Sequence, residues 1–370
     1  MQKNCARFGH IVSGTTFAAA LFLSTSLVAV PAIAAPSANV SVFATGFNNP
    51  RGLKFGPDGN LYVAEGGTGG SASTVGQCDQ VPSPVGPYTG SAHGGRISKV
   101  DSGGHRTTVT ASFPSSQTAA TEGNLVSGVA DVAFIGSTLY ALTAGAGCSH
   151  GVLNSTNGIY RVNSDGSHHL IADLSSYYKA HPTQTIEPDD FEPDGTPYSM
   201  VAERGSFYVV EPNHGELDRV STGGQISRVS DISASQGHIV PTSVAYHGNF
   251  YVGNLNPFPI QSGSSKILKI NPAGQLQTVV WGLTTVLGVA FDHRGRMYVL
   301  ENTTGNPFPT PGTGDIVRIS SGGSPEVIAS GLFLPTAMTF GPDGALYVSN
   351  VGFGPPPVGL GQVVRVTVPN

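Results

Sequence analysis

Six polar residues recur at one position of a repeated sequence pattern, each directly after a short strand-like run built around Tyr-Val or a similar pair. They are Glu65, Thr143, Glu211, Asn254, Glu301 and Asn350. If the repeats are arranged around one axis, these side chains converge on the mouth of a central channel. Oxygen ligands in such a ring suit a hard cation such as calcium. One interpretation is a calcium site held by Glu65, Glu211 and Glu301. The alternative, which we favour, is that the six side chains hydrogen-bond backbone groups at the strand ends and hold water molecules in the channel.

Two charged residues at the start of the preceding strand-like runs are expected at the same mouth. Arg51 would contribute a cation there and Asp131 a further carboxylate. Four histidines fall on or beside the same face and are candidate general bases, because histidine titrates near neutral pH. They are His93, His150, His214 and His238. We expect His214, within Asn213–Glu216, to be the most firmly held, although loop histidines are more often solvated turn residues.

Three local motifs match known patterns without the context that those patterns need. Gly147–Gly151 has the spacing of a nucleophile elbow, but the strand-to-helix turn of that motif is not expected here. Residues 190–195 resemble the opening of a calcium-binding loop, yet the twelfth position is Val201 where a bidentate acid is required. We instead expect the acidic run from Glu187 to Asp194 to form a solvated lid.

The N-terminus has the form of a signal peptide. Lys3 and Arg7 precede an uncharged apolar run from Ile11 to Val30, and small residues follow at positions 32–34. We predict residues 1–34 to be the signal peptide, with cleavage after Ala34. The alternative, an uncleaved membrane anchor, is disfavoured by the small residues and by Pro36. The mature protein is expected to be secreted or periplasmic, with no membrane attachment.

Export determines how the three cysteines are interpreted. Cys5 leaves with the signal peptide, so Cys78 and Cys148 remain as a pair in an oxidising compartment. We predict a disulfide between them. Two cysteines alone also make a poor metal site.

An internal repeat accounts for the positions of these residues. The same strand–turn–strand pattern occurs six times, with turns of the Pro-Asp-Gly or Gly-Asn type that favour tight hairpins. The six copies are Pro50–Glu65, Val129–Thr143, Pro197–Glu211, Pro241–Asn254, Val286–Glu301 and Pro335–Asn350. A third strand follows each copy and a fourth follows all but the last. Four-stranded units repeated without helical periodicity predict an all-β fold, a single six-bladed β-propeller over residues 35–370.

The last repeat lacks its fourth strand because the chain ends soon afterwards. Residues 40–47, which precede the first repeat, match the missing strand and are expected to close the ring. The predicted blades cover residues 50–110, 129–175, 197–232, 241–283, 286–332, and 335–370 with 40–47. The 370 residues include 50 Gly and 27 Pro, and only 11% are charged, which agrees with a turn-rich β fold. A net charge of −5 without a basic patch argues against nucleic-acid binding.

The loops between the second and third strands are long in every repeat except the third. The longest runs from Gly66 to Gly95, and the loop after it, from Ala144 to Asn157, holds the other predicted disulfide cysteine. Insertions concentrated on one face usually mark the binding face of a repeat protein. We expect a small molecule, a glycan or a protein partner to bind there.

Several of these segments are similar to the ScyD/ScyE family of exported propellers. The most specific are Glu211–Val220, Pro241–Pro259, Gly288–Asn302 and Pro335–Asn350. The resemblance implies an exported six-bladed propeller related to NHL-repeat and TolB-like proteins. It implies no defined activity. Asn254 and Gly288 stand where an acid is common in this pattern, and both reduce the negative charge expected in the channel.

Two classes of function follow. The first is an exported ligand-binding or accessory propeller that acts through its long-loop face, and we favour it. The alternative is a metal-dependent hydrolase of the gluconolactonase kind, with Glu65, Asn254 and Glu301 as candidate ligands. A quinoprotein sugar dehydrogenase is less favoured because it needs a basic clamp for its cofactor, and Arg51 is the only obvious cation at the mouth.

Overall fold

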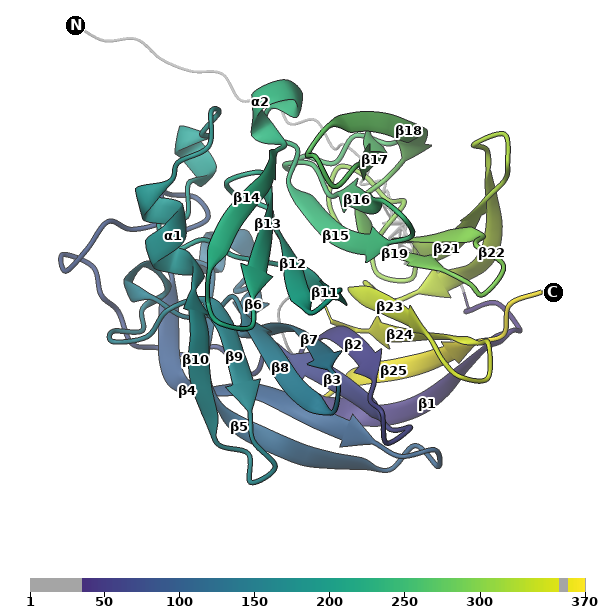
Figure 1. Cartoon of the computed structure of the whole chain (residues 1–370), viewed down its shortest axis with the longest axis horizontal. Helices are drawn as coiled ribbons and strands as arrows, with labels where there is room; N and C mark the ends of the chain where they lie inside the picture. The colour runs from purple at the N-terminus through teal and green to yellow at the C-terminus, as the bar shows by residue number, and fades with distance from the viewer. Residues whose placement is uncertain (1–34, 353–358, 370) are drawn as a thin grey trace, which may run out of the picture. The chain divides into compact units, whose positions relative to one another are not determined.

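In a computed structural model that describes residues 35–352 and 359–369, each repeat forms a small antiparallel sheet, and six sheets surround a common axis (Figure 1). The predicted all-β six-bladed propeller is confirmed. The described residues belong to one compact unit. The predicted signal peptide lies outside the described residues.

The six sheets follow the order of the repeats, with the innermost strand first in each blade. Blade 1 contains β2 (Pro50–Phe55), β3 (Leu61–Glu65), β4 (Thr89–Val100), β5 (Arg106–Gln117) and β6 (Val126–Ser127). Blade 2 contains β7 (Val129–Ile135), β8 (Thr138–Thr143), β9 (Gly158–Val162) and β10 (His168–Asp173). Blade 3 contains β11 (Ser199–Glu203), β12 (Ser206–Glu211), β13 (Glu216–Ser221) and β14 (Ile226–Asp231).

The second half of the ring repeats this plan. Blade 4 contains β15 (Pro241–Tyr246), β16 (Phe250–Asn254), β17 (Ser265–Ile270) and β18 (Leu276–Leu283). Blade 5 contains β19 (Val286–Phe291), β20 (Met297–Glu301), β21 (Gly314–Ile319) and β22 (Pro325–Leu332). Blade 6 contains β23 (Ala337–Phe340), β24 (Leu346–Asn350), β25 (Gly361–Val366) and, from the N-terminal side, β1 (Val40–Phe47).

The strand β1 completes blade 6 as the sequence predicts. It pairs antiparallel with β25 in a register that joins Val40 to Val366 and Phe47 to Gly361. The innermost strands β2, β7, β11, β15, β19 and β23 contact one another in a closed cycle. Ring closure by the N-terminal strand is therefore confirmed.

The core is divided among the blade interfaces. Each of the six clusters of buried apolar side chains joins two neighbouring blades, and together they cover all six interfaces. The alternating Tyr-Val strands supply both sides of an interface, as where Tyr62 of blade 1 meets Phe134 of blade 2 edge to face at 5.0 Å between ring centroids. A blade buries its apolar faces only with its neighbours in place, which explains why one repeat would not be stable alone.

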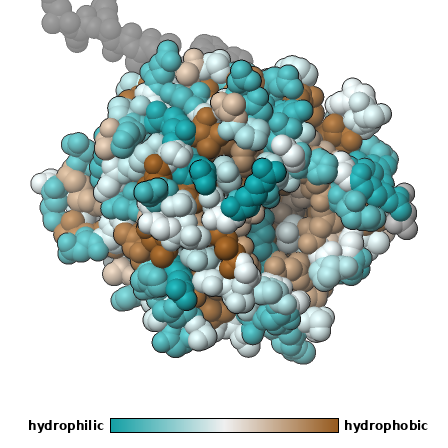
Figure 2. All heavy atoms as spheres, viewed as in Figure 1, coloured by the Kyte–Doolittle hydropathy of each residue, from teal (hydrophilic) through white to brown (hydrophobic). Residues whose placement is uncertain are grey.

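Irregular structure is concentrated between the blades and in the long loops. The short helices are α1 (Leu174–Ala180), α2 (Ser233–Gln236) and the 3₁₀ turns η1 (Ala120–Glu122), η2 (Cys148–His150) and η3 (Pro188–Asp190). The repeat pattern predicts none of these, nor the short strand β6. No helix in the described part of the chain has the length and hydropathy needed to cross a membrane. Viewed along the same direction as the ribbon, the surface is hollowed near its centre, where apolar and polar residues are both exposed (Figure 2).

Candidate functional site at the channel mouth

The three strand-end glutamates do not meet at the channel mouth. Glu65 is fully buried within its own blade, where it accepts hydrogen bonds from the backbone N–H of Asn48 at 2.7 Å and from Arg96 at 2.6 Å. Glu211 accepts from the backbone N–H groups of Thr196 at 2.7 Å and His214 at 2.5 Å. Both carboxylates therefore have their hydrogen-bonding capacity taken up locally.

The same role recurs around the ring. Asn350 accepts from the backbone N–H of Phe333 at 2.8 Å, and Glu301 accepts from the backbone N–H of Thr284. Asn254 donates to the carbonyl oxygen of Ile239 at 3.0 Å, and the Thr143 hydroxyl accepts from the backbone N–H of Gly158 at 3.0 Å. In most blades the strand-end side chain thus binds the backbone segment that enters the first strand. Buried backbone groups need such partners, because leaving one unpaired costs about 1–3 kcal/mol.

These contacts do not bring Glu65, Glu211 and Glu301 together as the hypothesised calcium site would require. In the described ranges, no three His, Cys, Asp or Glu residues are grouped so that they could hold a metal ion. The contacts are those of the alternative interpretation, in which strand-end residues secure the backbone. The donor set does not fit a shared cation, since each carboxylate points toward its own blade.

Arg51 and Asp131 do line the channel, but they do not pair. Asp131 accepts hydrogen bonds from the backbone N–H groups of Val132 at 2.8 Å and Met200 at 2.9 Å, and burial raises its pKa. Arg51 lies at a larger cavity nearer the mouth, and Tyr198 and Leu287 line both regions. Only Arg51 is therefore placed to meet a ligand that enters from the mouth.

The candidate histidines differ in their surroundings. His150 is fully buried, its Nδ1 lies 3.0 Å from the hydroxyl of Ser116, and burial lowers its pKa to about 4. His214 is buried too, with Nε2 3.1 Å from the carbonyl oxygen of Glu192. His238 pairs with Asp190 at 3.1 Å, while His93 is exposed. His214 is held in place, but His150 is held at least as firmly, and none of the four lines the inner cavity.

The acidic segment from Glu187 to Asp194 is only partly a solvated lid. Its first half forms η3 at the rim of the channel mouth, with Asp189 exposed. Its second half turns inward, leaving Glu192 and Asp194 only 7% and 4% exposed. Asp194 accepts hydrogen bonds from the backbone N–H and the hydroxyl of Ser149, both at 2.7 Å, and this segment is thereby attached to blade 2. The prediction of a solvated lid is wrong for this second half.

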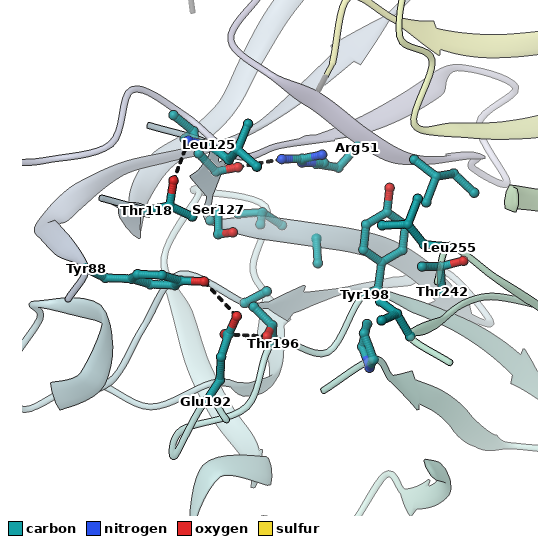
Figure 3. Close-up of a pocket in the computed structure, with 18 residues that line it drawn as sticks. Arg51, Tyr88, Thr118, Leu125, Ser127, Glu192, Thr196, Tyr198, Thr242 and Leu255 are labelled. Atoms are coloured by element: carbon teal, nitrogen blue, oxygen red, sulfur yellow. Dashed lines mark hydrogen bonds between the residues drawn. The ribbon is translucent and has the colours of Figure 1, made fainter. Parts of the chain in front are cut away.

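An inner cavity of about 170 Å³ lies at the channel mouth, where the first strands of the blades begin (Figure 3). Its wall is mainly apolar, with Val129 and Ala130 from β7 and Leu287 from β19. Its polar lining residues come from different elements and include Arg51 on β2, Tyr88 on the long loop of blade 1, and Glu192. The cavity is thus an apolar space with a small number of converging polar groups.

Glu192 and Tyr88 form a buried pair that sequence reasoning did not identify. The Tyr88 hydroxyl donates to Glu192 Oε1 at 2.6 Å, and the Thr196 hydroxyl donates to Oε2 at 2.5 Å. Burial raises the pKa of Glu192 to about 8, and the nearby charge of Asp190 adds to the shift. The group is therefore mostly protonated at neutral pH. Both residues lie in irregular insertions outside the repeat, so no periodic signal in the sequence points to them.

A second cavity of about 420 Å³ continues the inner one toward the surface. The two share five lining residues, Tyr88, Thr118, Leu125, Val240 and Leu255. The outer part has apolar walls that include Phe258 and a rim of carboxylates. The rim residues are Glu122, Glu187, Asp189 and Asp190. We call the two cavities together the mouth cleft.

The disulfide predicted between Cys78 and Cys148 is present. It joins the long loop of blade 1 to η2 in blade 2, and the Thr74 hydroxyl donates to the carbonyl oxygen of Cys148 beside it. The first loop carries Tyr88 and η2 contains His150, whose rings meet edge to face at 5.0 Å. The disulfide therefore supports one wall of the mouth cleft.

A carboxyl pair at the end of blade 5 predicts that stability depends on pH. Glu301 lies opposite Asp315 across β20 and β21, and burial raises the pKa of Glu301 to about 8, with the charge of Asp315 as the second cause. An unfolded glutamate titrates near about pH 4.3. The folded state therefore binds the proton of Glu301 more tightly than the unfolded state does. The stability that comes from this tighter proton binding is lost as pH rises through about 8. We expect the melting temperature to fall between about pH 5 and 8.5, and Glu301→Gln to reduce that fall.

Melting curves over this pH range test the expectation. Glu326→Gln serves as the control, because Glu326 is an exposed glutamate on the outer strand of the same blade. An equal pH slope in the wild type and in Glu301→Gln would contradict the prediction.

The fold and the site together define a six-bladed β-propeller with a cleft at the mouth of its channel. No family model and no curated protein matches the chain. Among solved structures, a gluconolactonase from Xanthomonas campestris aligns at 11% identity with a TM-score of 0.53, covering 89% of each chain. A glucose dehydrogenase aligns at 13% identity with a TM-score of 0.52, covering 89% of this chain and 99% of its own.

A structural genomics protein of unknown function from Bacteroides thetaiotaomicron is similar to about the same degree. It aligns at 12% identity with a TM-score of 0.54, covering 88% of this chain and 75% of its own. At identities this low the similarity shows the fold. Propellers carry many unrelated functions, so function has to be argued from the site.

Proposed function

We propose that the protein binds a small organic molecule in the mouth cleft. The observation that supports this most directly is the continuity of the two cavities, which lead from the acidic rim to a buried apolar end with converging polar groups. Sites for small molecules are typically concave and mostly apolar, with few well-placed polar groups. Cavities of about 170 and 420 Å³ also suit a small molecule better than a protein or a long glycan.

Binding is better supported than metal-dependent hydrolysis. The candidate hydrolase ligands Glu65, Asn254 and Glu301 each hold backbone groups of their own blade. A metal-assisted hydrolase needs several donors around one point to hold the ion and activate water. The name of the gluconolactonase neighbour is therefore not a basis for assigning that activity here.

Export belongs to the same proposal. The disulfide supports it, because such bonds persist mainly in oxidising compartments. The resemblance to the ScyD/ScyE family of exported propellers agrees with an accessory or binding role outside the cytoplasm.

Blocking the cleft tests the proposal. Leu255 lines both cavities, so we expect Leu255→Trp to fill the passage between them. Leu153→Trp is the matched control, since Leu153 is 48% exposed in a loop of blade 2. Each purified protein is exposed to a small-molecule extract of its host, washed and denatured, and the released compounds are identified by mass spectrometry.

We expect one or a few compounds to be retained by the wild type and by Leu153→Trp, and to be lost from Leu255→Trp. If all three proteins retain the same compounds in equal amounts, or none retains any, the proposed function is wrong.

A further inference from the structure

Arg51 lines the inner cavity beside Tyr198, and one of its two terminal nitrogens makes no hydrogen bond within the described part of the chain. Its side chain is only 9% exposed, and Nη2 donates to the carbonyl oxygen of Val126 at 2.5 Å. The other terminal nitrogen, Nη1, is buried and has no hydrogen-bond partner. Buried polar atoms are normally paired, so an unpaired guanidinium nitrogen at a cavity wall points to a ligand.

The guanidinium also lacks a counter-charge. In the described ranges, no salt bridge joins Arg51 to a carboxylate. Burial lowers the pKa of its guanidinium, and the neighbouring Tyr198 opposes that shift. The carboxyl group that shares the cavity, Glu192, receives hydrogen bonds from Tyr88 and Thr196. Burial also favours the neutral form of Glu192 at neutral pH. A buried cation without an anion is costly, and a negatively charged ligand would offset that cost.

We infer that the mouth cleft binds an organic monocarboxylate, whose carboxylate group pairs with the guanidinium of Arg51 and whose apolar body lies against Val129, Ala130 and Leu287. This inference rests on the proposed function and specifies the chemical class of the ligand. Arginine suits the role because its planar guanidinium donates directional, charge-assisted hydrogen bonds to carboxylates.

The acidic rim limits the class to ligands with a single negative charge. The rim carboxylates Glu122, Glu187, Asp189 and Asp190 are all exposed or half-buried. Water and salt screen such charges over about 10 Å at 0.1 M ionic strength, whereas the contact at Arg51 is buried and screened much less. A ligand with one carboxylate can therefore pass the rim and be stabilised at Arg51. A ligand with several negative charges would keep some of them beside the rim carboxylates, which repel them.

Three probes of nearly equal shape separate charge from size. They are cyclohexanecarboxylate, which is an anion, cyclohexanecarboxamide, which is a neutral acceptor, and aminomethylcyclohexane, which is a cation. Dissociation constants are measured by ligand-observed NMR at pH 7 for the wild type, Arg51→Met and Arg51→Lys. Arg161→Met is the control, because Arg161 is exposed on β9 and lines a different cavity.

We expect the carboxylate to bind the wild type more tightly than the amide or the amine does. A hydrogen bond to a charged group contributes about 1.5–3 kcal/mol, so Arg51→Met is expected to weaken carboxylate binding roughly tenfold to a hundredfold. Arg161→Met should leave that affinity unchanged. Arg51→Lys keeps the charge and is expected to lose less, which gives a second readout if Arg51→Met is poorly folded.

Three results would overturn the inference. They are failure of the carboxylate to bind the wild type, tighter binding of the amine than of the carboxylate, and equal carboxylate affinity in the wild type and both Arg51 variants. The blocked variant Leu255→Trp separates this failure from that of the proposed function. If compounds that require an open cleft carry no carboxylate, the inference fails while the binding function stands.

Discussion

Replacing both Cys78 and Cys148 by serine is expected to lower the free energy of unfolding by about 4 kcal/mol. The two cysteines are 70 residues apart in sequence, and their bond restricts the unfolded chain by closing a loop of that length. Loop-closure entropy for such a length corresponds to roughly 4 kcal/mol at 25 °C. For a domain of this size the melting temperature should fall by roughly 5 °C.

Chemical denaturation of the wild type and the double variant measures this difference. The single variants Cys78→Ser and Cys148→Ser provide the control, since either one already removes the bond. We expect each single variant to lose nearly as much stability as the double variant, so the two effects should not add. A double variant within about 0.5 kcal/mol of the wild type, the range of an ordinary surface substitution, would contradict the prediction.

The disulfide also connects stability to the mouth cleft. The loop that carries Cys78 continues to Tyr88, and η2, which contains Cys148, continues to Ser149 and His150. Tyr88 bonds to Glu192, and Ser149 bonds to Asp194 on the neighbouring inter-blade segment. Without the disulfide, we expect this wall to fluctuate more, because long loops with few apolar contacts are the first parts of a fold to open locally.

The fold could be derived from the sequence because the propeller repeats one local pattern six times. Each copy contains an apolar strand, a tight turn with glycine, and an alternating strand that includes Tyr-Val or a close variant, and the structure keeps the register of these pairs. Local patterns of this kind depend on neighbouring residues alone. The missing fourth strand of the last repeat and the additional strand-like segment Val40–Phe47 before the first repeat are likewise features of the sequence, so ring closure could be inferred without coordinates.

The site was harder to derive, because its residues lie where the repeat breaks down. Tyr88 and Glu192 come from insertions of different length in blade 1 and between blades 2 and 3, and no periodic rule places one against the other. Arg51 was expected at the channel mouth because it lies at the start of the first strand of blade 1. In the structure it does line the inner cavity. That it lacks a partner for Nη1 depends on contacts between distant segments, which a pattern in one sequence does not contain.

The strand-end residues show why a recurring polar position need not be a ligand. Glu65, Glu211 and Glu301 recur because each blade must secure the backbone that enters its first strand, and a carboxylate accepts two or more hydrogen bonds there. A repeated structural need produces the same sequence signal as a ring of metal ligands. The direction of the side chains distinguishes the two, and that direction comes from the three-dimensional structure.

Ring closure leads to the other large expected effect. Phe47, at the end of β1, is fully buried in the cluster that joins blades 6 and 1, where it packs with Leu53 and Val363. Arg106 lies over its ring, 5.9 Å from the centroid. Truncating a buried phenylalanine costs about 3–5 kcal/mol, so Phe47→Ala is expected to destabilise the protein by that amount.

A matched substitution in the same strand separates loss of the core contact from loss of the strand. Val42 is 58% exposed on β1, so Val42→Ala should change the free energy of unfolding by no more than about 0.5 kcal/mol. Urea denaturation of both variants measures the difference. Equal stabilities would mean that the N-terminal strand covers blade 6 without securing the ring. A large loss confined to Phe47→Ala would show that the first and last blades depend on each other through this one side chain.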